Sequence, residues 1–387
     1  MSKQISLEDC LTYVIDNRGV TPHKKNTEWV DKGIPVLSAN NVKTNGLQKM
    51  DEIRYISNEI YSSWMKKPLE KGDILLTSEA PAGEVMYWDS DEKVIVGQRL
   101  YGLKIKKKIN SKYLKYYLES QVGQNEIKKH ESGSTVFGIS AKTFSNIKVT
   151  LPDRDIQDKI GEILYSIDVQ IKRNNEMVQK LQVLAQTIFN KFYQNKMLNF
   201  NGTLNNLCSL PSGYNFKPDS YILNGKYDLI TIKNVNGIFV DYQKTNKINE
   251  LPDNLKSYCK LNIGDILISL TGNVGRISIN TASNGLLNQR VSIILCKNKD
   301  YKLYIYLLLN NPYYQLKITQ MANGTSQKNL SPLDIEKLKI YIPYNIKEFN
   351  NVTKGILDQM CKINLQTTKL IAIKNKILPL LINSQLK

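Results

Sequence analysis

The feature of this sequence that most constrains its fold is an internal duplication. Residues 71–77 (KGDILLT) match residues 263–269 (IGDILIS) at an offset of 192 residues, and Gly83 matches Gly275 at the same offset. Further matches follow in the same order to Lys369, while the offset drifts only from 192 to 189. A period this long is typical of two copies of one domain, because solenoid units repeat every ~20–50 residues.

Each copy begins with a strand-rich part. Short apolar runs bounded by Gly, Asp and Asn are typical of β-strands, and a helical pattern follows these runs in each copy. The runs predict strands at residues 34–37, 74–77, 228–232 and 266–270, and the helical patterns predict helices near 111–126 and 303–321.

A long helix with a heptad seam ends each copy. In copy one, seam positions recur at alternating steps of four and three for over four heptads, which is typical of a helix that packs on a partner helix. Copy two has a weaker seam, and Pro379 is expected to kink or end its helix. The seam residues are Ile160, Leu164, Ile167, Ile171, Asn174, Val178, Leu181, Ile188 and Phe192 in copy one, and Leu357, Asn364, Ile371 and Leu378 in copy two.

The two seam asparagines, Asn174 and Asn364, occupy matching places. A polar Asn at a seam position can fix the register of a coiled coil, or it can be a tolerated polar residue. The expected fold class is α+β, with two similar α/β domains in a pseudo-twofold arrangement, separated by an antiparallel coiled coil of two long spacer helices. The expected domains are residues 1–151 and 199–344, and the expected spacer helices are residues 152–198 and 345–387.

The net charge of +18 favours a polyanionic partner. Nucleic acid is the first candidate and an anionic membrane surface the second, while a generally basic proteome would explain the charge without a partner. No segment has the ~18 uninterrupted apolar residues of a membrane span, and we expect a soluble, cytoplasmic protein. Five cysteines without a CxxC pair indicate reduced thiols, and two distant histidines, His23 and His130, argue against a zinc site.

The sequence holds no motif that would make the chain an enzyme by itself. It lacks a GxxxxGK[ST] phosphate loop and a glycine-rich methyl-donor loop. The nearest match to an amino-methyltransferase motif, NPYY at residues 311–314, has the wrong third residue. A metal-dependent nuclease built on Asp253 and Asp300 is a minor alternative. We expect a DNA-binding chain without a cofactor or metal of its own.

Candidate DNA contacts are loop residues of the types that read bases or bind phosphate. Arg and Lys suit guanine and phosphate, and Asn and Gln suit adenine. Each residue alone could belong to a solvated turn, but the set recurs in matching places of both copies. The candidates are Arg18, Lys24, Lys25, Asn40, Asn41, Lys43, Ser134 and Thr135 in copy one, and Lys233, Asn234, Arg276, Gln289, Arg290, Thr325, Ser326 and Lys328 in copy two.

Several segments, taken in order, resemble the specificity subunit of type I restriction–modification systems. They are the opening at residues 13–22 and 33–42, the GDILLT segment with its continuation at 72–83, and the helix at 163–189. Each segment alone is a modest match, but their order, found twice, is specific. The resemblance covers the whole chain.

The resemblance implies two target-recognition domains, each reading one half of a bipartite, asymmetric site in double-stranded DNA, with spacer helices that set the gap. It also implies two docked methyltransferase subunits that use S-adenosylmethionine, and motor-nuclease restriction subunits in assemblies that cleave DNA. Arg18 and Gly19 have no clean counterpart in copy two, and Glu84 stands where copy two has Arg276. The two domains should therefore read different half-sites. A free-standing DNA-binding protein that acts by occupancy is the alternative.

Overall fold

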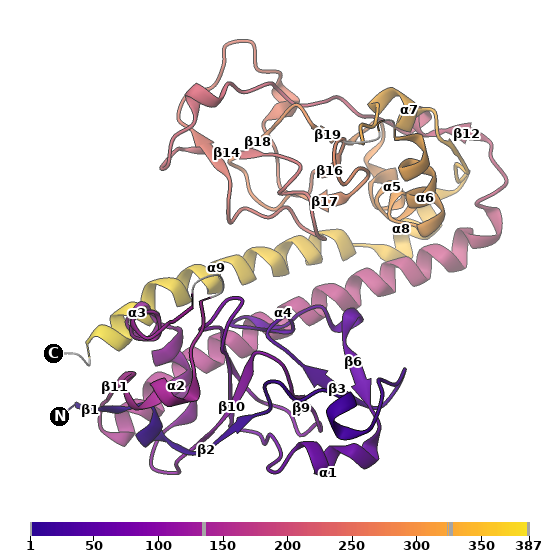
Figure 1. The fold of residues 1–387 in the computed structure, drawn as a ribbon. Helices are drawn as coiled ribbons and strands as arrows, with labels where there is room; N and C mark the ends of the chain where they lie inside the picture. The colour runs from indigo at the N-terminus through magenta and orange to yellow at the C-terminus, as the bar shows by residue number, and fades with distance from the viewer. Residues whose placement is uncertain (1, 134–136, 323, 325–327, 385–387) are drawn as a thin grey trace. The chain divides into compact units, whose positions relative to one another are not determined.

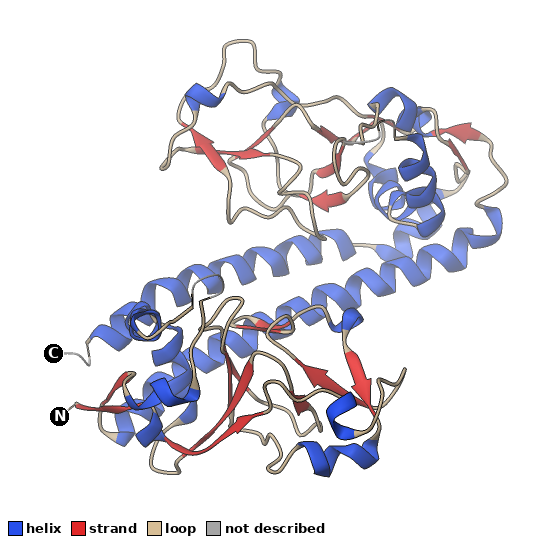
Figure 2. Cartoon of the chain, in the orientation of Figure 1, coloured by secondary structure: helices blue, strands red, loops and turns tan. Residues whose placement is uncertain are grey.

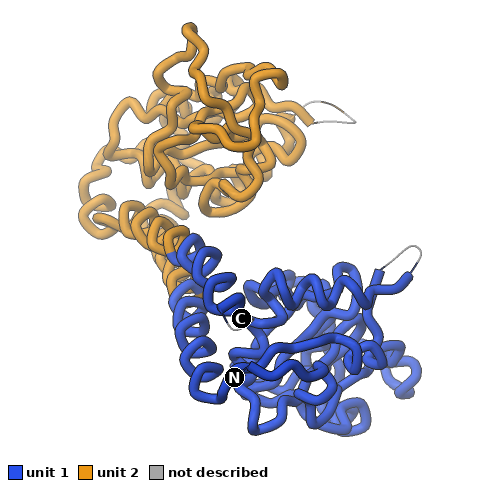
Figure 3. The backbone as a smooth tube through the Cα atoms, turned by 90° about the vertical axis from the view of Figure 1, so that its left-hand side faces the viewer, with its two compact units in different colours: residues 1–171, 370–387 blue, residues 172–369 orange. Residues whose placement is uncertain are grey.

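The computed structural model describes residues 2–133, 137–322, 324 and 328–384. The chain divides into two compact units: unit 1 comprises residues 1–171 and 370–387, and unit 2 comprises residues 172–369 (Figures 1 and 3). Each unit contains one α/β part and a stretch of each of two long helices. These helices are α4 (Arg154–Tyr193) and α9 (Ile356–Asn383).

The α/β part of unit 1 contains two main sheets (Figure 2). One is antiparallel with the order β2-β10-β7-β8, and the other has the order β6-β3-β9, in which β3 and β9 run parallel. The strands predicted at 34–37 and 74–77 are confirmed as β3 and β7. The strands are β1 (Lys3–Ser6), β2 (Leu11–Asp16), β3 (Ile34–Leu37), β4 (Val42–Lys43), β5 (Gly46–Leu47), β6 (Arg54–Ile56), β7 (Ile74–Thr77), β8 (Val85–Tyr87), β9 (Ile95–Val96), β10 (Leu100–Ile105) and β11 (Lys148–Leu151).

Unit 2 repeats this plan. Its sheet β17-β16-β19 corresponds to β8-β7-β10, and its sheet β15-β14-β18 corresponds to β6-β3-β9, again with one parallel pair, β14 and β18. The internal duplication is therefore a duplication of the fold. The strands are β12 (Gly202–Thr203), β13 (Cys208–Ser209), β14 (Tyr227–Ile230), β15 (Asn246–Ile248), β16 (Ile266–Ser269), β17 (Ile277–Ile279), β18 (Gly285–Leu287), β19 (Val291–Ile293), β20 (Leu295–Cys296) and β21 (Lys339–Ile340).

The sequence predicted one helix near residues 111–126 and one near residues 303–321, and the structure has a pair of shorter helices at each place. The side chain of Ser120 accepts a hydrogen bond from Gly123 N (3.3 Å) and starts a second helix in unit 1. In unit 2, Asn311 caps the second helix and Pro312 takes its first position, where a missing N–H costs nothing. The helices are α1 (Tyr61–Trp64), α2 (Ser111–Glu119), α3 (Gln121–Lys129), α5 (Lys302–Leu309), α6 (Pro312–Met321), α7 (Pro332–Glu336) and α8 (Ile346–Thr353).

The two long helices differ from their predicted limits. Helix α4 is continuous, as predicted, whereas the predicted helix 345–387 is interrupted at Gly355, whose φ of +78° is typical of a residue that ends a helix. Helix α9 does not end at Pro379, because a proline inside a helix removes only one backbone hydrogen bond and tertiary packing can offset that loss. Within the described residues, no helix is both long and apolar enough to cross a membrane.

The predicted seam packs α4 and α9 against each other inside unit 1. Ile160 and Leu164 of α4 share one buried core with Leu378 and Ile382 of α9. Further along α4, Asp168 forms an ion pair with Lys374, so residues later in α4 contact residues earlier in α9. The two helices are therefore antiparallel in this unit.

Asn364 binds the α/β part of unit 2. Asn174 is buried, but Asn364 Nδ2 donates to Thr281 Oγ1 (2.8 Å) in the α/β part of unit 2. The hydrogen bond of Asn364 thus fixes α9 to the sheet region and not to the other helix. For Asn364, this bond does not support the hypothesis that it sets the register of the coiled coil.

A cluster of two buried lysines and two partly buried carboxylates joins the two long helices to α2 in unit 1. Lys374 Nζ lies 2.7 Å from Glu119 Oε1 and 2.7 Å from Asp168 Oδ1, and Lys115 Nζ lies 3.0 Å from Asp168 Oδ2. Burial opposes the charge on Lys374, yet Glu119 and Asp168 raise its pKa. Burial likewise opposes the charge on Asp168, yet Lys115 and Lys374 lower its pKa. We name these residues, together with Tyr116, the seam charge cluster.

Candidate nucleic-acid interface

The same hairpin supports the candidate loops in each unit. Strands β7 and β8 form it in unit 1, and β16 and β17 form it in unit 2. Its entry turn is fixed by the aspartate of the repeated Gly-Asp pair. Asp73 Oδ2 accepts a hydrogen bond from Glu70 N (2.8 Å), and Asp265 Oδ2 accepts one from Asn262 N (2.7 Å). The repeated aspartate is thus part of the framework of the site.

A hydroxyl group at the end of the first strand closes each hairpin loop. Thr77 Oγ1 donates to the carbonyl four residues later (2.7 Å), and Ser269 Oγ does the same (2.6 Å). Each hydroxyl also accepts the N–H of the residue that follows the loop, Glu84 in unit 1 and Arg276 in unit 2. The two units therefore share one loop framework but differ in charge at this position, where unit 1 has a carboxylate and unit 2 has a guanidinium.

A glutamine that the sequence analysis missed holds each loop to the helix behind it. Gln124 Nε2 of α3 donates to the carbonyls of Gly83 and Leu118, both at 2.8 Å. Gln315 Nε2 of α6 donates to the matching carbonyls at 2.9 and 2.6 Å. The two glutamines are 191 residues apart, so the repeat itself contained the signal that could have found them.

Asn41 and Asn234 shape their loops and do not face outward. Each side-chain oxygen accepts hydrogen bonds from the N–H and the hydroxyl three residues earlier, and each amide nitrogen donates to a backbone carbonyl. Both side chains are buried. This corrects their assignment as DNA contacts. The adjacent Asn40 and Lys233 are exposed and keep that candidate role.

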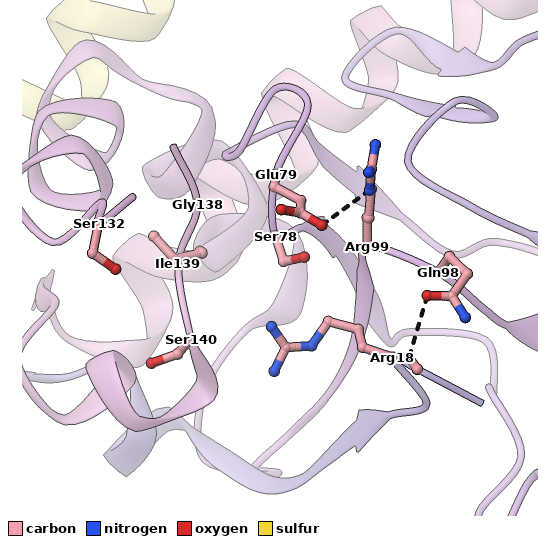
Figure 4. Close-up of a pocket in the computed structure, with 10 residues that line it drawn as sticks. Arg18, Ser78, Glu79, Gln98, Arg99, Ser132, Gly138, Ile139 and Ser140 are labelled. Atoms are coloured by element: carbon pink, nitrogen blue, oxygen red, sulfur yellow. Dashed lines mark hydrogen bonds and ion pairs between the residues drawn. The ribbon is translucent and has the colours of Figure 1, made fainter. Parts of the chain in front are cut away.

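A polar pocket of about 340 Å³ lies beside the hairpin loop of unit 1 (Figure 4). Its lining includes the turn at Arg18 and Gly19, and residues 138–140. Gln98 fixes that turn, because its Oε1 accepts Gly19 N (3.2 Å) and its Nε2 donates to Val20 O (2.8 Å). The pocket is therefore built from segments that are far apart in the sequence.

Arg18 lines this pocket with its guanidinium group fixed in place. Its Nε and Nη2 each donate to a carboxylate oxygen of Asp16 at 2.8 Å, and its Cζ lies 4.3 Å from the centre of the Tyr101 ring. The hydrogen bonds to Asp16 raise the pKa of Arg18, so the guanidinium stays charged. A fixed cation of this kind can meet a phosphate or a guanine.

A second arginine of the pocket was missed by the sequence analysis. Arg99 Nε lies 3.0 Å from Glu79 Oε1 in an ion pair at the rim (Figure 4). Arg99 matches Arg290 in the repeat, and only Arg290 was predicted as a DNA contact. The match with Arg290 could have identified Arg99 from the sequence, whereas the ion pair with Glu79 is visible only in the structure.

Unit 2 presents cations without carboxylate partners at the matching surface. Arg276, Arg290 and Lys328 are exposed, and within the described part of the chain none of them forms an ion pair. Gln289 and Lys233 are exposed as well. Side chains of this kind can supply both phosphate and base-edge contacts.

Three predicted lysines of unit 1 each use one donor internally. Lys24, Lys25 and Lys43 donate to backbone carbonyls at 2.8, 2.6 and 3.0 Å. An ammonium group has three donors, so each lysine can still contact a phosphate. The predicted contacts Ser134, Thr135, Thr325 and Ser326 lie outside the described residues.

The cysteine thiols do not form a reactive site. All five cysteines are free, and burial raises the pKa of each thiol, to about 12 for Cys10 and about 11 for Cys296 and Cys361. A thiol with a raised pKa is a poor nucleophile. Among the residues that the structure describes, no group of His, Cys, Asp and Glu side chains could hold a metal ion.

This chain is similar in sequence and in fold to known proteins. Two curated relatives from Methanocaldococcus jannaschii are specificity subunits, of the type I restriction enzymes MjaIX and MjaVIII. The first is 24% identical over 95% of this chain and 90% of its own length, and the second is 23% identical over 82% and 80%. The crystal structure of a type I restriction–modification S subunit from M. genitalium has the same fold, with a TM-score of 0.62 and 16% identity over 99% of this chain and 96% of that chain.

Both copies of the repeat match one protein family. Residues 2–183 and residues 200–375 each match the type I restriction modification DNA specificity domain. Together these matches cover almost the whole chain and coincide with the two copies found in the sequence. The protein therefore belongs to the specificity-subunit family of type I restriction–modification systems and carries two of its DNA specificity domains.

Proposed function

We propose that this chain directs a type I restriction–modification complex to a bipartite, asymmetric DNA site, with one unit for each half-site. The observation that carries the proposal is that the two units share a framework but differ at matching surface positions. Glu84 accepts hydrogen bonds from Thr44 N (2.8 Å) and Oγ1 (2.6 Å), whereas its counterpart Arg276 is exposed. Because base pairs differ in their donors and acceptors, two such surfaces select different sequences.

Exposed apolar side chains on the long helices support the docking of partner subunits. Leu184 of α4 in unit 2 and Ile373 of α9 in unit 1 are each 49% exposed, and they match at an offset of 189. Met177 and Val183 extend the first patch, and Leu380 extends the second. Exposed apolar patches of this kind mark protein interfaces.

Each patch can receive one partner subunit. We infer that these partners are two methyltransferase subunits, which would bring S-adenosylmethionine and the catalytic residues. Motor-nuclease restriction subunits would join the same complex when DNA is cleaved. In this scheme α4 and α9 separate the two reading units, and their length sets the gap between the half-sites.

The test is a genome-wide map of methylated adenines in cells that carry this chain and its methyltransferase. We expect a gapped motif that disappears when the chain is deleted. Exchange of residues 1–151 for those of another family member should change one half of that motif and leave the other half intact. Identical maps with and without the chain would refute the proposal and favour a protein that acts by occupancy.

A separate pair of variants tests the docking patches. Leu184→Asp with Ile373→Asp should abolish methylation while DNA binding by the chain persists, because only the partner contacts are lost. Asn175→Asp, at an exposed position of the same helix α4 that is not on the face of Met177 and Leu184, is the control and should keep methylation. Full methylation by the double variant would contradict the docking assignment.

A further inference from the structure

The pocket of unit 1 contains polar groups that have no evident structural task. Ser78 is 1% exposed, yet among the described residues its Oγ has no hydrogen-bond partner. Ser78 and Glu79 lie at the end of β7, and Arg99 lies just before β10, so three polar side chains meet at one edge of the pocket (Figure 4). A buried hydroxyl without a partner indicates a place where a ligand group can complete the hydrogen bonding.

The ion pair between Glu79 and Arg99 does little for stability. The side chains of Glu79 and Arg99 are 35% and 54% exposed, and pairs so open to water contribute little. Arg99 also has a φ of +59°, a left-handed conformation that is unfavourable for a residue other than glycine. Such conformations persist mainly at functional sites, where the surrounding structure holds them. Stability alone therefore does not explain the ion pair and the left-handed backbone of Arg99.

The unused atoms of the ion pair define what it can bind. Arg99 uses Nε towards Glu79, so its two terminal nitrogens still point away from that bond as a pair of donors. Glu79 keeps its second oxygen as an acceptor. A donor pair beside an acceptor matches in kind the major-groove edge of a C·G pair, where cytosine N4 donates and guanine O6 and N7 accept. The carboxylate disfavours a backbone phosphate in the same place.

We propose, on the basis of the DNA-reading function inferred above, that Glu79 and Arg99 read a C·G base pair in the half-site of unit 1. Glu79 accepts a hydrogen bond from cytosine N4, and the terminal nitrogens of Arg99 donate to guanine O6 and N7. The ion pair holds both groups in register before DNA arrives, so less ordering is needed on binding.

Unit 2 lacks this reading pair. The residues that match Ser78 and Glu79 are Leu270 and Thr271, so unit 2 has no carboxylate at the position of Glu79. At the equivalent position of the second half-site, unit 2 therefore offers no carboxylate at this position to accept a hydrogen bond from cytosine. This difference makes the second half-site an internal control in the experiment below.

The experiment is selection from a random duplex DNA library by the full chain, followed by sequencing. The wild-type chain should enrich a gapped motif with a C·G pair in one half. Glu79→Gln should lower the preference for C·G at that one position by about 5- to 150-fold and favour A·T, because a glutamine amide pairs with adenine N6 and N7. Arg99→Gly should lose selectivity at the same position and keep the fold, because glycine suits a positive φ.

The control variant is Glu92→Gln, which removes an exposed carboxylate of unit 1 outside the pocket and should leave the motif unchanged. The half-site of unit 2 should be the same for all variants. The inference is overturned if Glu79→Gln and Arg99→Gly enrich the wild-type motif, or if they change different base pairs. A wild-type chain that enriches no gapped motif would overturn the proposed function, and this inference with it.

Discussion

The substitution Lys374→Met tests whether the seam charge cluster holds α9 on unit 1. Methionine keeps the apolar stem but leaves the partly buried carboxylates of Glu119 and Asp168 without the cation 2.7 Å away. Removal of one partner from a buried ion pair costs about 3–5 kcal/mol. Because Lys115 still binds both carboxylates, we expect the free energy of unfolding of unit 1 to fall by about 2–3 kcal/mol.

Tryptophan fluorescence in urea measures this loss in unit 1 alone. The three tryptophans of the chain, Trp29, Trp64 and Trp88, all lie in unit 1, and the last two are buried. With a slope of about 2–3 kcal/mol per molar urea, the midpoint should fall by about 1 M. Lys376→Met, at an exposed position one half-turn along α9, is the matched control and should shift the free energy by no more than about 0.5 kcal/mol.

A double-mutant cycle with Asp168→Asn decides whether the cluster acts as a unit. In the background of Lys374→Met, Asp168→Asn should cost at least about 1 kcal/mol less than in the wild type, because one of its two cationic partners is already gone. The reasoning fails if the two substitutions are additive, or if Lys374→Met and Lys376→Met shift the midpoint equally.

Other variants and conditions test further parts of the structure. The pKa of Asp168 is lowered in the folded state, so the stabilisation from this carboxylate is present above its ordinary pKa of about 4 and is lost as the pH falls through its folded pKa. The wild-type urea midpoint should therefore drop more steeply in acid than that of Lys374→Met. Asn234→Ala should lower the free energy of unfolding by about 1–3 kcal/mol in thermal unfolding, since it removes the hydrogen bonds that this buried side chain makes to its loop. Arg276→Ala should weaken binding to all DNA and reduce the slope of log affinity against log salt by about one in a titration; an unchanged slope would exclude a phosphate contact. The five thiols should resist a disulfide reagent at pH 8 until the protein unfolds, because burial raises each thiol pKa. One heptad inserted into both α4 and α9 adds about 10 Å and should widen the gap of the methylated motif by roughly three base pairs.

The parts of the fold that the sequence predicted depend on local or periodic signals. The duplication, the strands at residues 34–37 and 74–77, and the continuous helix α4 are each visible in a short window or in a repeated one. Apolar periodicity reports which face of an element is buried, whatever that face meets. The helix pairs behind the sheets were missed because a cap such as Ser120 acts through its own hydrogen bonds, which a periodic pattern does not show.

Taken alone, the sequence determined that this chain has two similar units and two long helices, and its charge favoured a polyanionic partner, because composition and repetition are properties of the chain itself. Only the tertiary structure decided which polar residues are exposed and which are used inside the fold. It buried Asn41 in its own turn, joined Glu79 to Arg99 at the rim of a pocket, and brought Lys374 to Asp168 across 206 residues. Charge and hydrogen-bonding capacity are set by residue type, but their use depends on neighbours that are distant in sequence, and folding alone brings those neighbours together.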